Sequence, residues 1–138
     1  MLHSTQILQP MFALVMLTFM VLLQIPIARF RAAFAGRVTV ADFALGESEH
    51  VPPETRLPNR NYMNLLELPV LFYVGCLSMY VTDRGDATAC TIAWIYVGLR
   101  AVHSLIHLSY NDVRHRLLAF GTSNIVLSVL WIRFFVML

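Results

Sequence analysis

The sequence PMFALVMLTFMVLLQIPI occupies residues 10–27 and contains no charged side chain. A run of this length and composition is typical of a helix that crosses a bilayer. A cleaved signal peptide is disfavoured, because the flank MLHSTQ carries no positive charge and the arginines follow the run instead of preceding it. We therefore predict a retained membrane span over about residues 8–28.

Three more apolar segments follow, and they predict helices over about residues 61–82, 87–110 and 117–138. The composition agrees with spans, since 58% of the residues are hydrophobic, 13% are charged and the mean hydropathy is +0.66. A soluble domain usually has about 25% charged residues. The sequence thus predicts an all-α protein in which residues 1–138 form one domain, an integral membrane four-helix bundle.

The distribution of positive charge predicts the orientation, because arginine and lysine collect in cytoplasmic loops. All ten basic residues are arginine. Most of them lie in the connections after the first and third spans, namely Arg29, Arg31, Arg37, Arg56, Arg60, Arg114 and Arg116. The opposite side has only Arg84 and Arg133. Both termini are therefore predicted on the non-cytoplasmic side. A net charge of +2 without a basic run does not support nucleic-acid binding.

The third predicted helix carries polar residues on one face. These are Arg100, His103, His107, Tyr110 and Arg114, which fall within an arc of about 80° at about 100° per residue. Ionisable groups are costly at membrane depth and usually face other helices or water. This face is therefore expected to line a crevice between helices.

A second polar face lies on the preceding helix, where Arg60, Asn64 and Glu67 fall within about 60°. Glu67 is the deepest of these and needs a cation, and Arg100 is the arginine within the third span. We expect the two to pair, either as part of a site or only as a link between helices. The two faces then form a slot that opens toward the cytoplasm, with arginines at its rim: Arg29, Arg31, Arg114 and Arg116.

The slot's guanidinium, carboxylate, amide and imidazole groups suit a small anion with more than one carboxylate and an amino group. His103 and His107 have the i, i+4 spacing of metal ligands, but no acidic or cysteine partner lies nearby, so no metal site is predicted. Cys76 and Cys90 lie inside apolar segments and are expected to be small buried hydrophobes.

The run LRAVHSLIHLSYNDVRHR (residues 99–116) and the RxxxNxxE pattern ahead of it resemble the MAPEG family, membrane-associated proteins of eicosanoid and glutathione metabolism. The motif RFRAAF at the end of the first span agrees with this resemblance, which covers nearly the whole chain. The chain is most similar to the short bacterial members, which implies a bacterial inner membrane. The resemblance also implies a homotrimer, in contact with membrane lipids, that binds glutathione between helices of adjacent protomers.

The resemblance also implies roles for particular residues. Arg116 falls where active members have an arginine credited with stabilising the glutathione thiolate, which makes it the catalytic candidate. The glutathione-binding candidates are Arg29, Arg31, Arg60, Asn64, Glu67, Arg100, His103, His107, Tyr110 and Arg114. The chain departs from the family pattern at His107, where several family enzymes have a tyrosine.

These features favour a glutathione-dependent transferase or peroxidase for lipophilic electrophiles or lipid hydroperoxides. One alternative is a non-catalytic membrane scaffold that binds a lipid or small anion in the same crevice, because the family includes a non-enzyme member. A polar-lined transporter is disfavoured by the small number of spans and the lack of a broken-helix pair. The sequence identifies neither the second substrate nor whether the protein is active.

Overall fold

The computed structural model describes residues 4–138, and within them every regular element is helical. The elements in chain order are η1 (Ser4–Ile7), α1 (Leu8–Phe34), η2 (Val40–Phe43), α2 (Pro53–Leu66), α3 (Pro69–Val81), α4 (Ala87–Leu108) and α5 (Val113–Met137). The predicted all-α class is therefore confirmed.

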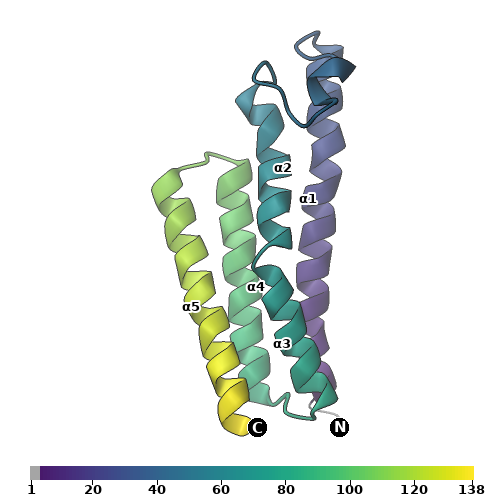
Figure 1. The fold of residues 1–138 in the computed structure, drawn as a ribbon. Helices are drawn as coiled ribbons and strands as arrows, with labels where there is room; N and C mark the ends of the chain where they lie inside the picture. The colour runs from purple at the N-terminus through teal and green to yellow at the C-terminus, as the bar shows by residue number, and fades with distance from the viewer. Residues whose placement is uncertain (1–3) are drawn as a thin grey trace.

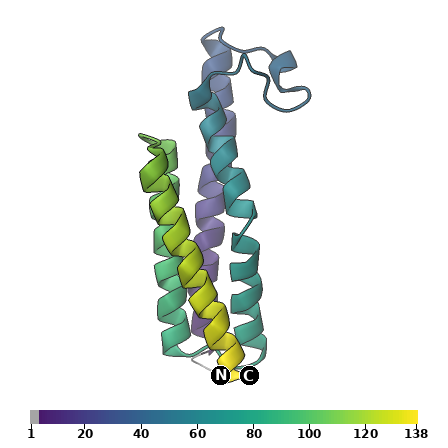
Figure 2. The same ribbon diagram turned by 60° about the vertical axis from the view of Figure 1, so that its left-hand side comes forward.

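Four helical segments are long and apolar enough to cross a membrane: Thr5–Phe34, Pro53–Val81, Ala87–Leu108 and Val113–Met137. They run side by side, and both termini lie at one end of the bundle, which we call the terminal end (Figure 1). The α1–α2 and α4–α5 connections lie toward the opposite end, the loop end. Figures 1 and 2 both show α1 and α2 extending beyond the α4–α5 turn. The protein is thus a multi-pass membrane protein with a four-helix bundle.

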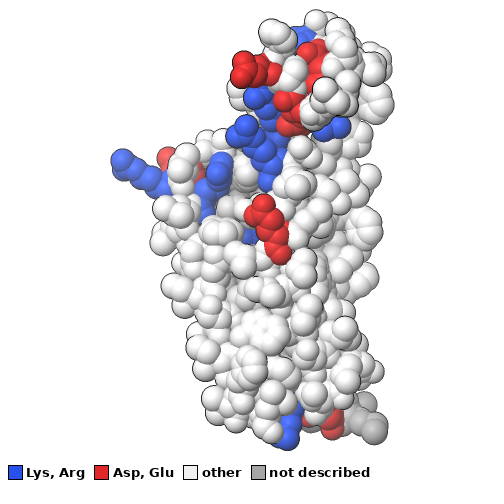
Figure 3. Space-filling model, viewed as in Figure 1, with Lys and Arg blue, Asp and Glu red and all other residues white. Residues whose placement is uncertain are grey.

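Charged side chains avoid the middle of the bundle. In Figure 3 they gather around the loop end and at the terminal end, with an almost uncharged band between them. Large apolar side chains that are more than half exposed lie midway along α1 and α5, such as Phe19, Leu23 and Ile125. An apolar surface of this kind is expected where a bundle faces lipid or another apolar surface.

The second span is broken in two at Pro69. The sequence predicts one helix over residues 61–82, but α2 ends at Leu66 and α3 begins at Pro69. Proline has no N–H, and its ring would clash with the carbonyl of Leu65 in a continuous helix. The backbone instead forms short-range bonds, with Val70 N donating to Glu67 O and Leu71 N to Leu68 O. Glu67 therefore lies just past the end of α2 instead of inside a helix.

The α1–α2 connection folds against the end of α1. Gly36 ends α1 with a positive φ of 67°, and Arg37 N donates back to Ala32 O. Val38, Val51 and Phe43 then pack on Ala32 as a small core of their own. The connection also contains the 3-10 turn η2, which contributes Phe43 to this core.

The main apolar core fills the terminal half of the bundle. Phe72 on α3 stacks on Tyr96 of α4 with ring centroids 4.6 Å apart, and both side chains are fully buried. The buried polar residues of α4 begin one turn further along, at Arg100. Buried polar groups are therefore found in the half of the bundle nearest the loop end, which we call the loop half.

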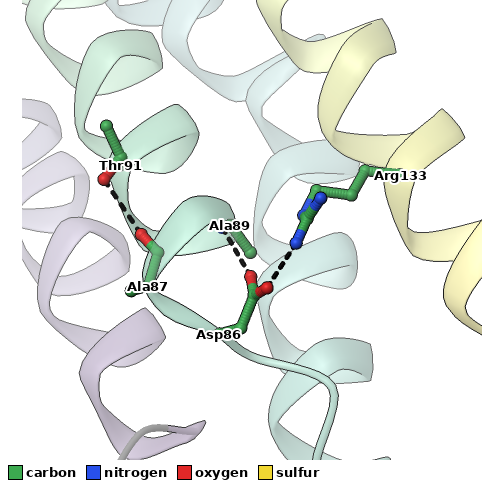
Figure 4. Close-up of polar contacts among 5 residues, drawn as sticks. All are labelled: Asp86, Ala87, Ala89, Thr91 and Arg133. Carbon is green, nitrogen blue, oxygen red and sulfur yellow. Dashed lines mark hydrogen bonds and ion pairs between the residues drawn. The ribbon is translucent and has the colours of Figure 1, made fainter.

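Asp86 links the start of α4 to the far end of α5 (Figure 4). Its Oδ1 accepts a hydrogen bond of 2.8 Å from Ala89 N, and its Oδ2 forms an ion pair with Arg133 Nη2. Burial raises the pKa of Asp86, but the bonds from Ala89 N and Arg133 outweigh burial and hold this pKa below its ordinary value. The carboxylate is both a helix cap and a tie between two spans.

We predict that Asp86→Ala lowers the free energy of unfolding by about 1 kcal/mol near neutral pH, because the helix loses its N-cap. Asp86→Asn should cost less, since asparagine also caps helices and only the ion pair is lost. The pKa of Asp86 is depressed in the folded protein. The wild type should therefore be more stable than Asp86→Asn above pH 3.8, and this difference in the free energy of unfolding should disappear as the pH falls below 3.8. Helical circular dichroism in detergent measures each unfolding curve, and equal stability of all three proteins would contradict the prediction.

Candidate functional site

Arg100 lies at the centre of a buried polar cluster. Its side chain is fully buried, and Nη2 donates to two oxygens of Asn64 on α2, the backbone O at 3.0 Å and Oδ1 at 2.6 Å. The guanidinium also lies over the Phe120 ring of α5, 5.6 Å from its centroid. One charged group thus brings α2, α4 and α5 together.

The Arg100 guanidinium uses only some of its donors. Nε and Nη1 are buried and have no partner within residues 4–138, and no carboxylate of that region forms an ion pair with Arg100. A guanidinium keeps its charge in a protein, and a buried charge is costly unless it is paired. The two unused donors are therefore a place where an anionic ligand gains strong, charge-assisted bonds.

His103 connects α4 to the first turn of α5. Its Nδ1 lies 3.2 Å from the backbone O of Arg116. A carbonyl oxygen only accepts, so Nδ1 carries the proton and Nε2 of the neutral ring is an acceptor. Nε2 is buried without a partner in the described chain. The ring is thus held in one orientation with a bare nitrogen.

His107 lies one turn further along α4, and its ring meets that of His103 edge to face at 5.8 Å. The His107 side chain is only 4% exposed, yet neither ring nitrogen has a partner in the described chain. Buried imidazoles of the interior are normally hydrogen-bonded. Two adjacent rings with open nitrogens are more typical of a ligand site than of a core.

Arg116 completes the cluster from α5. Its Nη1 donates to Asn111 Oδ1 at 2.6 Å, while its Nε is buried and has no partner in residues 4–138. Asn111 belongs to the short turn between α4 and α5, which also holds Asp112. The Asp112 carboxylate accepts from the backbone N–H groups of His115 and Arg114, and these bonds lower its pKa.

An open groove of about 200 Å³ lies between α2, α4 and α5. It is lined by Asn64, His103, His107, Val113, Arg116, Leu117 and Phe120. Its walls are therefore polar on the α4 side and partly apolar on the α5 side. Arg100 is not among the lining residues, but Arg100 contacts two of them, Asn64 and Phe120. The groove can receive a small polar anion next to an apolar group.

Several predicted site residues lie outside this groove. Arg29 pairs with Glu47 at 3.3 Å and lies over the Phe43 ring, beside a separate apolar cavity of about 330 Å³ between α1 and η2. Arg31 on α1 and Arg60 on α2 are exposed, and neither lines the groove. The predicted arginine rim is therefore not continuous in the structure.

The predicted pairing of Glu67 with Arg100 is not formed in this chain. Glu67 is exposed just past the end of α2, and Asn64, one turn earlier, takes its place as the partner of Arg100. The break at Pro69 is the physical reason, because it ends the helix that would have carried Glu67 on the same face.

The polar face of α4 is shorter than the sequence predicts. α4 ends at Leu108, so Tyr110 lies in the following turn and Arg114 lies on α5. Both are exposed. The Tyr110 hydroxyl lies 3.0 Å from His115 Nδ1 instead of facing the groove. Arg100, His103 and His107 are the part of the predicted face that is buried.

Four residues of the cluster were not predicted from the sequence, namely Asn61, Ser104, Asn111 and Phe120. Asn61 on α2 is fully buried and accepts a bond of 3.2 Å from Ser104 on α4. Asn111 holds Arg116, and Phe120 packs on both Arg100 and His103. Asn61 lies three residues before Asn64, and Ser104 lies four residues after Arg100, so each shares a helix face with a predicted site residue. This spacing is a signal that can identify Asn61 and Ser104. Nothing in the periodicity identifies Asn111, because it lies in a turn.

Comparison with protein-family models gives a match to the model described as MAPEG family over residues 7–136. No curated protein and no solved structure matches the chain significantly. The match covers nearly all of the four spans and every residue that lines the groove. Within the described residues, no group of three or more metal-ligating side chains that could hold a metal ion accompanies it.

Because the Arg100 guanidinium is only partly hydrogen-bonded, substitutions of Arg100 and Asn64 should have different and non-additive effects on stability. Asn64→Leu should lower the free energy of unfolding by about 2 kcal/mol, because a buried charged donor loses its side-chain acceptor. Arg100→Met should be nearly neutral, since it removes the buried charge as well as its bonds. The double variant should match Arg100→Met, so the two costs should not add. Unfolding curves in detergent measure all three, and simple additivity would contradict the prediction.

Proposed function

Because the chain belongs to the MAPEG family, we propose that it is a membrane-bound glutathione-dependent transferase or peroxidase acting on lipophilic electrophiles or lipid hydroperoxides. The observation that carries this proposal is a groove bordered by Arg116 and by the open imidazole nitrogens, whose residue Asn64 is bonded to the buried Arg100 with its two unused donors. A site of this kind favours an anion that brings both carboxylates and donors, and glutathione has two carboxylates, an ammonium group, amides and a thiol.

The groove of one protomer is proposed to be part of a site that adjacent protomers share in a homotrimer. Arg31, Arg60 and Glu67 are exposed in the single chain. They are thus free to contact a ligand held between two copies. Glu67 suits the ammonium group of glutathione, and the arginines suit its carboxylates. Arg29, Tyr110 and Arg114 remain candidates for the same shared site.

Arg116 is proposed to make the bound thiol reactive. A free thiol has a pKa of about 8.5 and is mostly protonated at neutral pH, whereas a nearby cation favours the nucleophilic thiolate. The Arg116 guanidinium borders the groove and is anchored by Asn111. The thiolate sulfur then attacks an electrophilic carbon that reaches the groove from the bilayer, and the carbon either loses its leaving group as an anion or, in an addition to a double bond, takes up a proton. With a lipid hydroperoxide the sulfur attacks the terminal oxygen and breaks the O–O bond, so that the lipid leaves as an alcohol after protonation and the sulfur becomes a sulfenic acid. A second glutathione then converts the sulfenic acid to glutathione disulfide and water. Holding the two reactants together at the membrane surface lowers the barrier further.

The loop end is proposed to face the cytoplasm of a bacterial cell, with both termini across the inner membrane. The arginines of the α1–α2 and α4–α5 connections support this orientation. It also places the groove where glutathione is abundant. The lipid-facing surface of α5 next to the groove, with the exposed Leu117 and Leu118, suits the approach of a lipophilic second substrate.

The proposal predicts that glutathione raises the unfolding temperature of the purified protein and that the protein conjugates glutathione to a chromogenic electrophile. Arg100→Met should weaken glutathione binding at least tenfold, as expected for the loss of charge-assisted bonds. Arg116→Met should lower kcat at least tenfold with a smaller effect on binding. Arg84→Met, at the terminal end, is the matched control and should change neither value.

Binding without any turnover would support the non-catalytic scaffold found among members of this family instead. The absence of both a thermal shift and turnover would overturn the glutathione proposal. If Arg116→Met retains full turnover, the role assigned to Arg116 is wrong even if glutathione binds.

A further inference from the structure

Asn111 has a backbone conformation that few residue types adopt. Its φ is 51°, in the left-handed region, and its N–H donates to Ile106 O at 2.8 Å to close the end of α4. Glycine adopts this conformation most easily, and asparagine is one of the few other residues that tolerates it. The turn by itself therefore needs either residue, and it does not need the asparagine side chain.

The asparagine side chain makes a contact that glycine lacks. Oδ1 accepts a bond of 2.6 Å from Arg116 Nη1, and Asn111 itself is only partly exposed. The backbone of Arg116 is held from the other side, by His103 Nδ1 on α4. Arg116 is thus fixed at its backbone by α4 and at its guanidinium by the α4–α5 turn.

We propose that Asn111 is a positioning residue that holds the Arg116 guanidinium at the groove. The inference rests on the proposed function, in which that guanidinium stabilises the glutathione thiolate. Arginine is long and flexible, and a cation that moves among rotamers stabilises a developing anion less than one that is already in place. Because Arg116 Nη1 donates to Asn111 Oδ1, the guanidinium is held at one edge. The buried Nε of Arg116 has no partner in the described chain.

Two substitutions separate this role from a purely structural one. Asn111→Gly keeps the left-handed turn and removes the acceptor, so the fold should persist while Arg116 is released. Asn111→Asp keeps both the turn and an oxygen at the same place, but its negative charge partly cancels the field of Arg116. The first variant therefore changes geometry, and the second changes charge with the geometry retained.

The readout is the ultraviolet absorbance of the bound glutathione thiolate, followed as a function of pH. Asn111→Gly should raise the apparent pKa of the thiol by roughly half a unit, which lowers the thiolate fraction about threefold at a pH well below that pKa. Asn111→Asp should raise it as well. In an Arg116→Met background Asn111→Gly should have no further effect, since it acts through that arginine. An unchanged pKa in Asn111→Gly, or an equal effect without Arg116, would overturn the proposal.

A second measurement needs no glutathione. Phenylglyoxal modifies accessible guanidinium groups, and mass spectrometry gives the rate at Arg116. Asn111→Gly should react at least threefold faster than the wild type, in line with a lost charge-assisted bond, and Asn111→Asp should react no faster. Arg84 in each protein is the internal reference. Equal rates at Arg116 in all three proteins would refute the positioning role. If glutathione does not bind at all, the proposed function fails and this rate alone decides the role of Asn111.

Discussion

The burial of Arg100 is the constraint on which the loop half of the bundle depends. A guanidinium does not lose its charge inside a protein, so the helices around it must supply acceptors. Asn64 supplies two oxygens from α2, and Phe120 supplies the face of its ring from α5. One side chain thus contacts residues of two neighbouring helices, and both of these residues line the candidate site.

The two halves of the bundle are held together by different forces. In the terminal half, apolar contacts such as the stack of Phe72 on Tyr96 fill the space between helices. In the loop half, a chain of polar contacts replaces them, through Asn61, Ser104 and the Arg100 cluster. The break at Pro69 lies in the second span where these halves meet, and it lets α2 and α3 follow separate directions.

The α4–α5 turn does more than reverse the chain. It ends α4 directly after His107, begins α5 on the Asp112 cap, and holds Arg116 through Asn111. His103 adds a bond from α4 to the first turn of α5. The residues that border the groove are therefore placed by a short and well-bonded connection, which suits a site that must keep its charges in fixed positions.

Most of the buried cluster was predictable because it depends on local rules. Hydropathy predicts the helical bundle, and a period of 3.6 residues places Arg100, His103 and His107 on one face. The same rule failed for Tyr110, because it assumed that the helix continues. The left-handed Asn111 instead belongs to the turn after α4, and no periodic pattern reports such a turn.

What the sequence by itself determined is the class of the protein: apolar spans whose inner faces carry charge, since length, composition and periodicity are properties of each helix alone. The tertiary structure alone decided the partners. Arg100 binds Asn64 and not Glu67, and Arg29 turns to Glu47. Such pairings depend on where each helix breaks and on which residues of neighbouring helices lie side by side. Both are set by packing between segments that are far apart in the chain.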